Sequence, residues 1–350
     1  MEFGLFCSAQ ANNGAFGPET GQGFRDYLDF NVEAEALGFR SSFLVEHHFT
    51  GWNQVSSTLM LLTALAMRTT RLRLGSAVMV LPWHNPVLLA EQAATLDLIS
   101  GGRFDFGIGK GYRYSEFNGF QIAPEEAQAR FDEAVEVMTR AFTMRQRFSH
   151  RGRFWHFEDI VVEPPPAQQP HPPFWIAAGS EPSIRSAAAR GFNLILDQYA
   201  SARTLGERID VYKAERQRCG LRFDPTQVVV ARQLYVARDE ADKQAALTRQ
   251  AAYTKRTVDV SRKPDGKGGS QTGSQPGSHV LAYADKAGGT EENALYGTPD
   301  EIAAMLEDLQ RAGVHHVLMV VSGGVAQLRR FARDIMPAFA GSAPAADAAE

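Results

Sequence analysis

The chain has 350 residues, of which 44% are hydrophobic and 22% charged, and its formal net charge is -4. This composition is typical of a globular protein that buries a large core, and it offers no basic surplus for binding nucleic acid or anionic membranes. Only Cys7 and Cys219 are cysteines, no apolar run reaches about 18 residues and no signal peptide is visible, so we expect a cytoplasmic protein without a disulfide scaffold or a membrane span.

Short apolar runs alternate with longer amphipathic runs along the chain. The apolar runs predict eight strands: Phe3–Cys7, Ser41–Val45, Leu72–Leu81, Phe104–Ile108, Phe174–Ala178, Asn193–Leu196, Gln227–Ala237 and His316–Val321. The amphipathic runs predict helices over 24–37, 56–67, 86–99, 125–142, 181–190 and 204–219, from 239 onward, after a capping box at 298–301, and over 327–337. About eight β-α units without a linker indicate one (β/α)8 TIM barrel over residues 1–340.

One segment, residues 258–290, interrupts this alternation with Gly, Ser, Thr and Gln. Such a composition cannot bury enough apolar surface to order itself, so we expect a flexible insertion between strands seven and eight. Long loops of this kind are often active-site lids, although a functionless insertion is the alternative. The Ala-rich residues 341–350 are expected to form a disordered tail.

In a parallel barrel, chemistry sits where the strands end. Glu46-His47-His48 follows the second strand, and a histidine there is a candidate for proton transfer because its pKa lies near neutrality. The alternative is a histidine that only bonds a neighbouring loop. We expect no metal site, because there is no His-Glu-x-x-His spacing and no cysteine cluster.

Two further segments suit an anionic or flat ligand. The loop Gly107–Tyr112 fits neither the G-x-G-x-x-G fingerprint nor a Walker loop, but its glycines allow a close backbone approach and Lys110 adds a positive charge. The segment Gly179–Ser183 joins a strand to a helix, where hydroxyls and free amides can bind a phosphate. The alternatives are a plain tight turn for the first segment and simple helix capping for the second.

Several segments together resemble the bacterial luciferase-like, flavin-dependent monooxygenase family, closest to the alkanal monooxygenase α-chain branch. The matching segments, in order, are Met1–Gly4, Glu46–Phe49, Leu74–Pro82, Ala90–Gln92, Leu96–Asp97, Ser100–Phe104, Phe106–Gly111, Ala178–Ser180 and Tyr296–Pro299. The resemblance implies a barrel with an insertion before the last strand. It also implies reduced FMN from a separate NAD(P)H:flavin reductase, which reacts with dioxygen to a hydroperoxyflavin that oxygenates a small organic substrate.

The resemblance assigns roles to individual residues. His47 matches the essential histidine of the family, and Ala77-Val78 matches a non-prolyl cis peptide beneath the flavin ring. On the phosphate side, Lys110 matches an arginine, Ser180 and Ser183 match hydroxyl positions, and Arg130 matches a further arginine. The remaining expected cofactor contacts are Gly109, Tyr112, Gly179 and Gln198. The resemblance also implies a homodimer that packs through the apolar helices near 56–67 and 86–99.

The sequence departs from the luciferases at three positions. Gly109 stands where their α-chains have a reactive cysteine, Gly179 replaces a glutamate, and Gln198 lies near a tryptophan position. These departures count against light emission with long-chain aldehydes. Two other functions stay open: a deazaflavin-dependent dehydrogenase or reductase of the same fold, and a flavin-binding barrel without catalysis.

Overall fold

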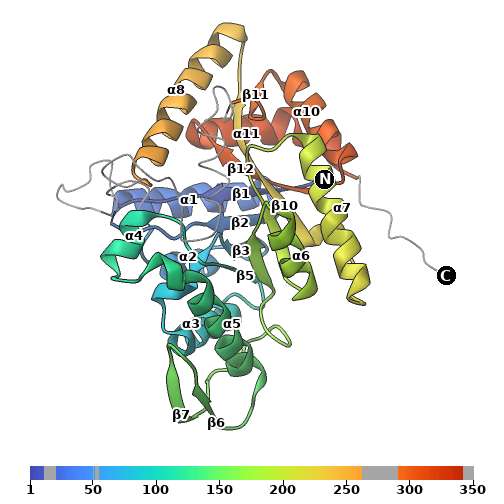
Figure 1. Ribbon diagram of the computed structural model, residues 1–350. Coiled ribbons are helices and arrows are strands. Elements are labelled where there is room, and N and C mark those ends of the chain that lie inside the picture. The colour runs from blue at the N-terminus through green and yellow to red at the C-terminus, as the bar shows by residue number, and fades with distance from the viewer. Residues whose placement is uncertain (12–20, 50, 52–54, 262–290, 342–350) are drawn as a thin grey trace.

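The computed structural model describes residues 1–11, 21–49, 51, 55–261 and 291–341. Within these residues, eight parallel strands close into a barrel because the last strand of the path, β9, pairs with β10 (Figure 1). In barrel order the strands are β1 (Glu2–Cys7), β2 (Ser41–Leu44), β3 (Arg73–Ser76), β5 (Phe104–Gly109), β8 (Phe174–Ala177), β9 (Asn193–Leu196), β10 (Val228–Val236) and β12 (His316–Val321). The predicted TIM barrel is confirmed.

Helices cover the outside of the barrel and connect its strands. They are α1 (Gln22–Ala36), α2 (Thr58–Ala66), α3 (Pro86–Ile99), α4 (Tyr114–Gly119), α5 (Ala127–Thr143), α6 (Glu181–Ala189), α7 (Ala202–Arg218), α8 (Glu240–Asp259), α10 (Pro299–Arg311) and α11 (Gly324–Asp334). Some of these helices begin with a side-chain cap: Asn85 accepts from two amides of α3, and Thr298 and Glu301 form the predicted capping box of α10. No helix in these residues combines the length and the apolarity that a membrane span needs.

The prediction of one continuous strand over Leu72–Leu81 is wrong. The structure divides this run into β3 and the short β4 (Met79–Val80), followed by a 3-10 turn at Leu81–Trp83. The Ala77-Val78 peptide bond between β3 and β4 is cis. Nine of the ten residues, all except Arg73, are apolar or small, so the apolar pattern alone could not locate the division. Two elements were not predicted at all, namely α4 and the strand β11 (Leu295–Gly297), which extends the sheet beside β10.

The interior of the barrel is filled by side chains from several strands. Its apolar cluster consists of Phe43, Trp175, Ile195, Val229 and Leu318. Phe43 leaves no room for a neighbour on β3, because a Cβ at Gly75 would lie 2.2 Å from its ring. A larger apolar core lies between the strands and the helices. The tight interior fixes the strands and therefore the loops at their carboxyl ends.

An ion pair closes the amino end of the barrel. Arg73, at the start of β3, donates to both oxygens of Asp105 on β5 at 2.8 and 2.7 Å. The indole Nε1 of Trp175 on β8 donates to the same carboxylate at 3.1 Å. The buried carboxylate of Asp105 is thus satisfied by donors from both strands that neighbour β5.

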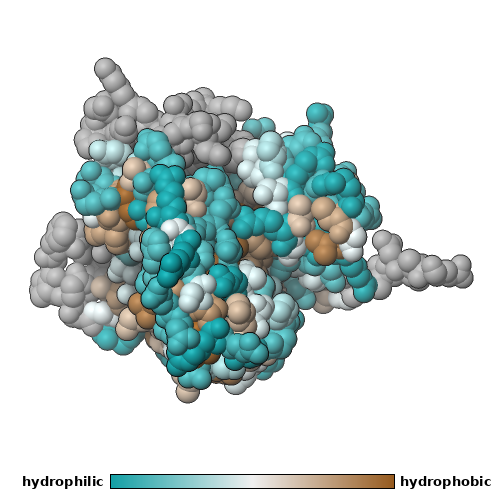
Figure 2. All heavy atoms as spheres, turned by 60° about the horizontal axis from the view of Figure 1, so that its bottom comes forward, coloured by the Kyte–Doolittle hydropathy of each residue, from teal (hydrophilic) through white to brown (hydrophobic). Residues whose placement is uncertain are grey.

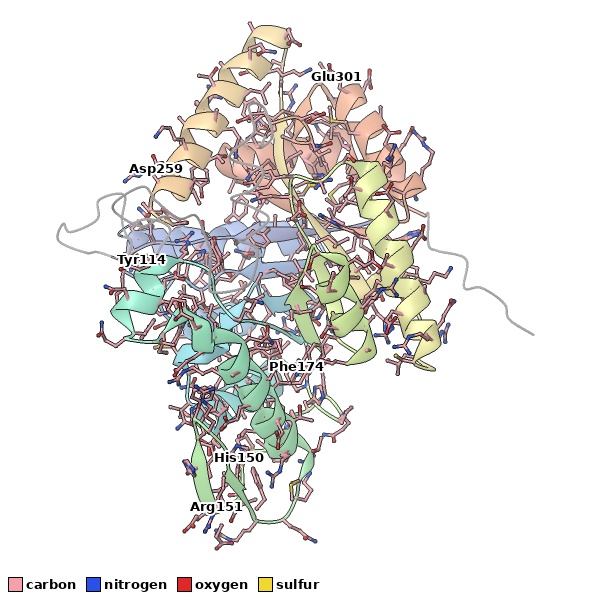
Figure 3. All side chains as sticks on the ribbon, viewed as in Figure 1. Tyr114, His150, Arg151, Phe174, Asp259 and Glu301 are labelled. Atoms are coloured by element: carbon pink, nitrogen blue, oxygen red, sulfur yellow. The ribbon has the colours of Figure 1, made fainter. Side chains whose placement is uncertain are left out.

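Two segments outside the barrel complete the described fold. Strands β6 (Phe148–Arg151) and β7 (His156–Ile160) form an antiparallel hairpin that packs on α5 through Glu133, which accepts four backbone hydrogen bonds from the turn. Figure 3 marks this hairpin with His150 and Arg151, away from the barrel. The face shown in Figure 2 is mainly hydrophilic, with small separate groups of apolar residues.

The predicted insertion and tail lie mostly outside the described residues. Residues 258–261 belong to the end of α8 and the turn after it, whereas 262–290 and 342–350 are not described. Whether residues 258–290 form a lid therefore stays a prediction. In Figures 1 and 3, α8 descends toward α4, with Asp259 marking the end of α8 and Tyr114 the start of α4.

Candidate active site

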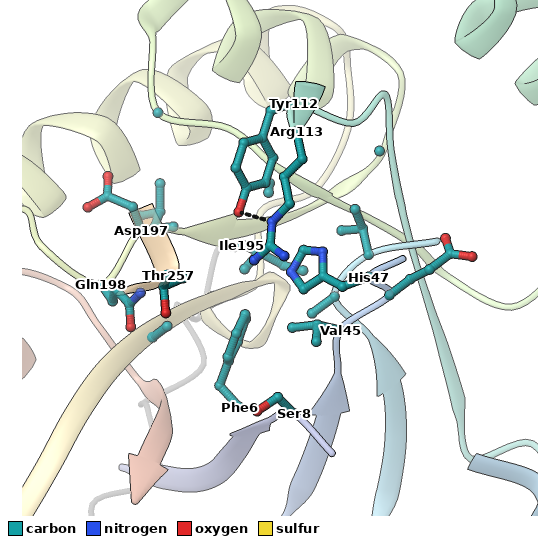
Figure 4. A pocket seen from close by; sticks show the side chains of 18 of the residues that line it. Phe6, Ser8, Val45, His47, Tyr112, Arg113, Ile195, Asp197, Gln198 and Thr257 are labelled. Atoms are coloured by element: carbon teal, nitrogen blue, oxygen red, sulfur yellow. Dashed lines mark hydrogen bonds between the residues drawn. The ribbon is translucent and has the colours of Figure 1, made fainter. Parts of the chain in front are cut away.

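A cavity of about 430 Å³ opens at the carboxyl ends of the barrel strands, a volume within the usual range of small-molecule sites (Figure 4). Its wall is formed mainly by residues that end or follow the strands, together with Gln233 within β10, Glu116 of α4, and Tyr253, Thr254 and Thr257 of α8. Ten residues expected from the sequence lie on this wall: His47, Ala77, Val78, Gly109, Lys110, Tyr112, Gly179, Ser180, Ser183 and Gln198. The strand ends thereby bring together residues that are far apart in the sequence, up to the 151 positions that separate His47 from Gln198.

Arg130 is the one expected site residue that does not line the cavity. Its Nε donates to Glu126 at 2.9 Å, one turn earlier, and its guanidinium lies 4.4 Å from the centre of the Phe154 ring. Both contacts hold the side chain on the outer face of α5, toward the β6–β7 hairpin. In the described structure Arg130 therefore contributes to packing and not to the cavity wall.

His47 follows β2 and forms a hydrogen bond with a carboxylate that the sequence analysis missed. Its Nδ1 lies 2.9 Å from Oε1 of Glu116 on α4, and the same oxygen accepts the backbone amide of His48 at 3.1 Å. Because a carboxylate can only accept, the bond puts the proton on Nδ1 and leaves the lone pair on Nε2. Burial, together with the charge of Arg113, lowers the pKa of His47 although Glu116 works in the other direction. The imidazole is thus a neutral base at neutral pH.

Glu46 organises the loops beside His47. Its carboxylate accepts from Nε2 of His48 at 3.2 Å, from Nε2 of His84 at 2.7 Å and from the amide of Val80 at 2.6 Å. Burial opposes the charge, but these hydrogen bonds lower the pKa of Glu46 to about 2. The adjacent His48 is therefore a structural partner of Glu46, whereas His47 alone of the pair lines the cavity.

Two hydroxyls and an ammonium group form a polar corner of the cavity. Ser180 stands at the N-cap of α6 but makes no side-chain bond to the helix backbone; its hydroxyl instead donates to Ser183 at 2.9 Å. Lys110, at the end of the neighbouring strand β5, donates to Gln128 at 3.2 Å. Burial lowers the pKa of Lys110, against the charge of Asp132. Hydroxyls, a helix N-terminus and an ammonium group are the donors that a phosphate prefers.

Between this corner and His47 the wall is apolar and closely packed. The cis bond of Ala77-Val78 lies there, at the position that the resemblance implies. A Cβ at Gly109 would lie 2.4 Å from Cγ2 of Val78. The absence of a side chain at Gly109 therefore lets β5 approach Val78, and it keeps this part of the wall open to a flat ligand.

Two buried polar atoms of the cavity wall have no hydrogen-bond partner among the described residues. They are Nη1 of Arg113, a donor, and Oε1 of Gln233, an acceptor. The amide of Gln233 donates to Gln198, whose own amide donates to Tyr199. Buried polar groups are normally satisfied, so ligand groups are expected opposite both atoms. The Oε1 of Gln233 can accept from an N–H of a flavin ring, and the Lys110 corner suits the flavin phosphate; these residues therefore fit FMN, and Nη1 of Arg113 is left for another ligand group.

Sequence reasoning missed Arg113, Glu116 and Gln233. Arg113 and Glu116 lie just after the glycine-rich loop. Two charged residues among aromatic ones at the end of a strand were the only indication of them in the sequence. Gln233 lies in the middle of β10, where a polar residue in a β-branched run was the only indication. Among the described residues, no group of three His, Cys, Asp or Glu side chains could hold a metal ion.

The geometry now allows a comparison with known proteins. The family model described as luciferase-like monooxygenase matches residues 1–316. The oxygenase component of the flavin-dependent trigonelline monooxygenase from Acinetobacter baylyi is 25% identical over 327 residues, which cover 88% of each chain.

Solved structures agree with this result. The monooxygenase RslO1 from Streptomyces bottropensis superposes with a TM-score of 0.80 at 27% identity, over 97% of this chain and 100% of that one. An F420-dependent secondary alcohol dehydrogenase in complex with an F420-acetone adduct has a TM-score of 0.74 at 17% identity, covering 96% and 98% of the two chains. At that identity the second likeness shows the fold alone.

Proposed function

This chain belongs to the luciferase-like monooxygenase family, and from that premise we propose that it is the oxygenase of a two-component, FMN-dependent monooxygenase. It would receive reduced FMN from a separate NAD(P)H:flavin reductase and use dioxygen to oxygenate a small organic substrate. The observation that most supports this is the presence, in one cavity, of the His47–Glu116 pair and the Lys110, Ser180 and Ser183 donors.

The chain's own residues have distinct tasks in this proposal. Ser180, Ser183 and Lys110 would bind the FMN phosphate, and Ala77, Val78 and Gly109 would face its ring. Bound reduced flavin would supply the electrons that activate dioxygen. Glu116 holds the proton on Nδ1 of His47, so that Nε2 can take up a proton and return it during turnover. The apolar wall excludes water from the reacting atoms.

The partners in this proposal rest on separate observations. A relative of similar length is named as an oxygenase component, which supports a separate reductase. Helices α2 and α3 expose Met60, Met67 and Leu88 at 74%, 73% and 52%, which supports a homodimer through these helices; the mass in solution tests it. The free thiols of Cys7 and Cys219 suit the cytoplasm.

Binding tests the cofactor assignment. FMN should bind much more tightly than riboflavin, and Lys110→Ala should weaken FMN by about tenfold or more, because a charge-assisted phosphate contact contributes about 1.5–3 kcal/mol. Titration followed by flavin fluorescence measures both effects. Equal affinities for FMN and riboflavin would remove the phosphate assignment.

Dioxygen consumption separates the proposal from the alternatives. Photochemically reduced FMN is mixed with the protein, air-saturated buffer and a panel of ketones, aldehydes and terpenes, and oxygenated product is quantified. His47→Ala should lower product formation by about 10²–10⁴-fold while FMN affinity is retained. Hydride transfer from reduced F420 to a ketone or aldehyde of the panel, or from the resulting alcohol to oxidised F420, without oxygenated product would instead support the dehydrogenase or reductase, whose fold is shared. No turnover with either flavin would support a binding protein without catalysis.

A further inference from the structure

Arg113 is a buried cation that forms no ion pair in the described structure. It precedes α4, is only 2% exposed and lines the cavity. Its Nε donates to the hydroxyl of Tyr112 over a long 3.4 Å, and its Nη1 has no partner among the described residues. Figure 4 shows the guanidinium extended between Tyr112 and His47. A fully buried arginine normally has its donors paired, so this one needs an explanation.

The three carboxylates of the cavity wall are engaged elsewhere. Glu116 accepts from His47 and from the amide of His48. Glu46 accepts from His48, His84 and the amide of Val80. Asp197 accepts from Arg208 at 2.5 Å and from the amides of Tyr199 and Ala200. Within the described ranges, Arg113 forms no ion pair with any of them.

The guanidinium nevertheless keeps its charge. Burial works against it, but the surrounding Tyr112, Glu116 and Tyr253 raise the pKa of Arg113 above its usual range. A buried, charged group with an unused donor is costly unless an anion completes it. A polar group that converges on an apolar cavity in this way is typical of a ligand contact.

The FMN phosphate does not account for this charge. The donors assigned to the phosphate lie at the ends of β5 and β8, which are neighbours in the barrel. Arg113 also follows β5, but its guanidinium extends to His47, at the end of β2 (Figure 4). In barrel order β3 separates β2 from β5, and β5 separates β3 from β8, so the guanidinium and the phosphate donors face different parts of the cavity.

We propose that Arg113 binds the carboxylate of an organic acid and thereby holds the substrate beside His47. The inference rests on the proposed function, because it assigns a substrate class to the same site. A planar guanidinium whose Nη1 has no partner among the described residues presents a charged donor suited to a carboxylate. Phe6, Val45 and Ile195 line the same cavity and would contact the hydrocarbon part of the acid (Figure 4).

The experiment compares acids with neutral amides of the same shape. Isothermal titration measures benzoate against benzamide, 2-naphthoate against 2-naphthamide, and octanoate against octanamide, on the protein saturated with oxidised FMN and again on the protein without FMN. In at least one pair the acid should bind about tenfold or more tightly than the amide, because its contact with Arg113 is charge-assisted. Arg113→Gln should abolish the preference, and Arg113→Lys should retain part of it.

Lys110→Gln is the matched control, since it removes the other cavity cation. It should weaken FMN and leave the acid preference, measured without FMN, unchanged. FMN affinity of Arg113→Gln within about twofold of wild type shows that the variant is folded and that the arginine serves the acid.

Three results would overturn the inference: no acid preference in any pair, a preference that survives Arg113→Gln, or a loss of FMN affinity in Arg113→Gln as large as in Lys110→Gln. Failure of the wild-type protein to bind FMN would refute the proposed function instead, and the titrations without FMN would still decide the role of Arg113.

Discussion

At the amino end of the barrel, Arg73 meets its carboxylate inside the protein, whereas at the carboxyl end Arg113 has none in the described structure. The Arg73–Asp105 pair is bidentate and is completed by the indole of Trp175. Arg113 has one long hydrogen bond, to Tyr112. Arg73 therefore stabilises the fold at one end of the barrel, whereas Arg113 at the other end is available to bind a ligand. This difference agrees with the usual division of TIM barrels into a stability face and a functional face.

The largest effect should come from removing the carboxylate at the amino end. Asp105→Asn removes the buried carboxylate from Arg73, whose side chain is 27% exposed, and should lower the free energy of unfolding by about 4 kcal/mol, as expected for a broken, largely buried pair. Urea unfolding followed by circular dichroism measures it. Arg113→Gln is the control: it breaks no ion pair within the described residues and should cost no more than about 1 kcal/mol. Similar losses in both variants would abolish the distinction between the two ends.

Lowering the pH should remove the stabilisation that the ionised carboxylate of Glu46, beside the cavity, gives to the folded protein. The pKa of Glu46 falls from an ordinary 4.5 to about 2 in the folded protein. Its stabilisation, about 3 kcal/mol, is therefore fully present above about pH 4.5 and is lost as the pH falls toward 2. Urea unfolding of wild type and Glu46→Gln between pH 3 and 7 measures the difference. A difference between the two proteins that stays constant over this range would contradict the prediction.

The smallest effects concern the protonation of His47. Arg113 lowers its pKa and Glu116 raises it. Arg113→Gln should therefore shift the pKa of His47 upward, and Glu116→Gln should shift it downward. Titration of the imidazole resonances by NMR detects both shifts. Shifts in the same direction would show that neither charge acts on His47 as described.

The barrel and the position of its cavity could be predicted from the sequence because both follow from local patterns. Parallel strands end at one edge, so motifs such as Glu46–His48 and Gly179–Ser183 had to converge once the strands were identified. The family resemblance added the cis bond at Ala77-Val78, which the structure contains. The division of the third strand could not be predicted, because its apolar pattern continues through the interruption.

The partners of the site residues were not predictable in the same way. His47 and Glu116 are 69 positions apart and meet only because α4 follows β5 at the rim. The sequence pattern did not single out Arg113, because its lack of an ion-pair partner among the described residues can be seen only in the three-dimensional structure. Arg130 shows the opposite error: its position in the sequence suggested a phosphate contact, but Glu126, four residues earlier, holds it outside the cavity. Side-chain pairing depends on packing that a pattern of residue types does not contain.

The close approach of Gly109 to Val78 also constrains how this enzyme can evolve. The resemblance places the luciferase cysteine at Gly109, but a Cβ there would lie 2.4 Å from Cγ2 of Val78, beside the cis bond. Introducing that cysteine into this chain therefore requires a smaller residue at Val78 first. The geometry thus sets the order of the two substitutions, and a single change at Gly109 would displace Val78 from the cavity wall.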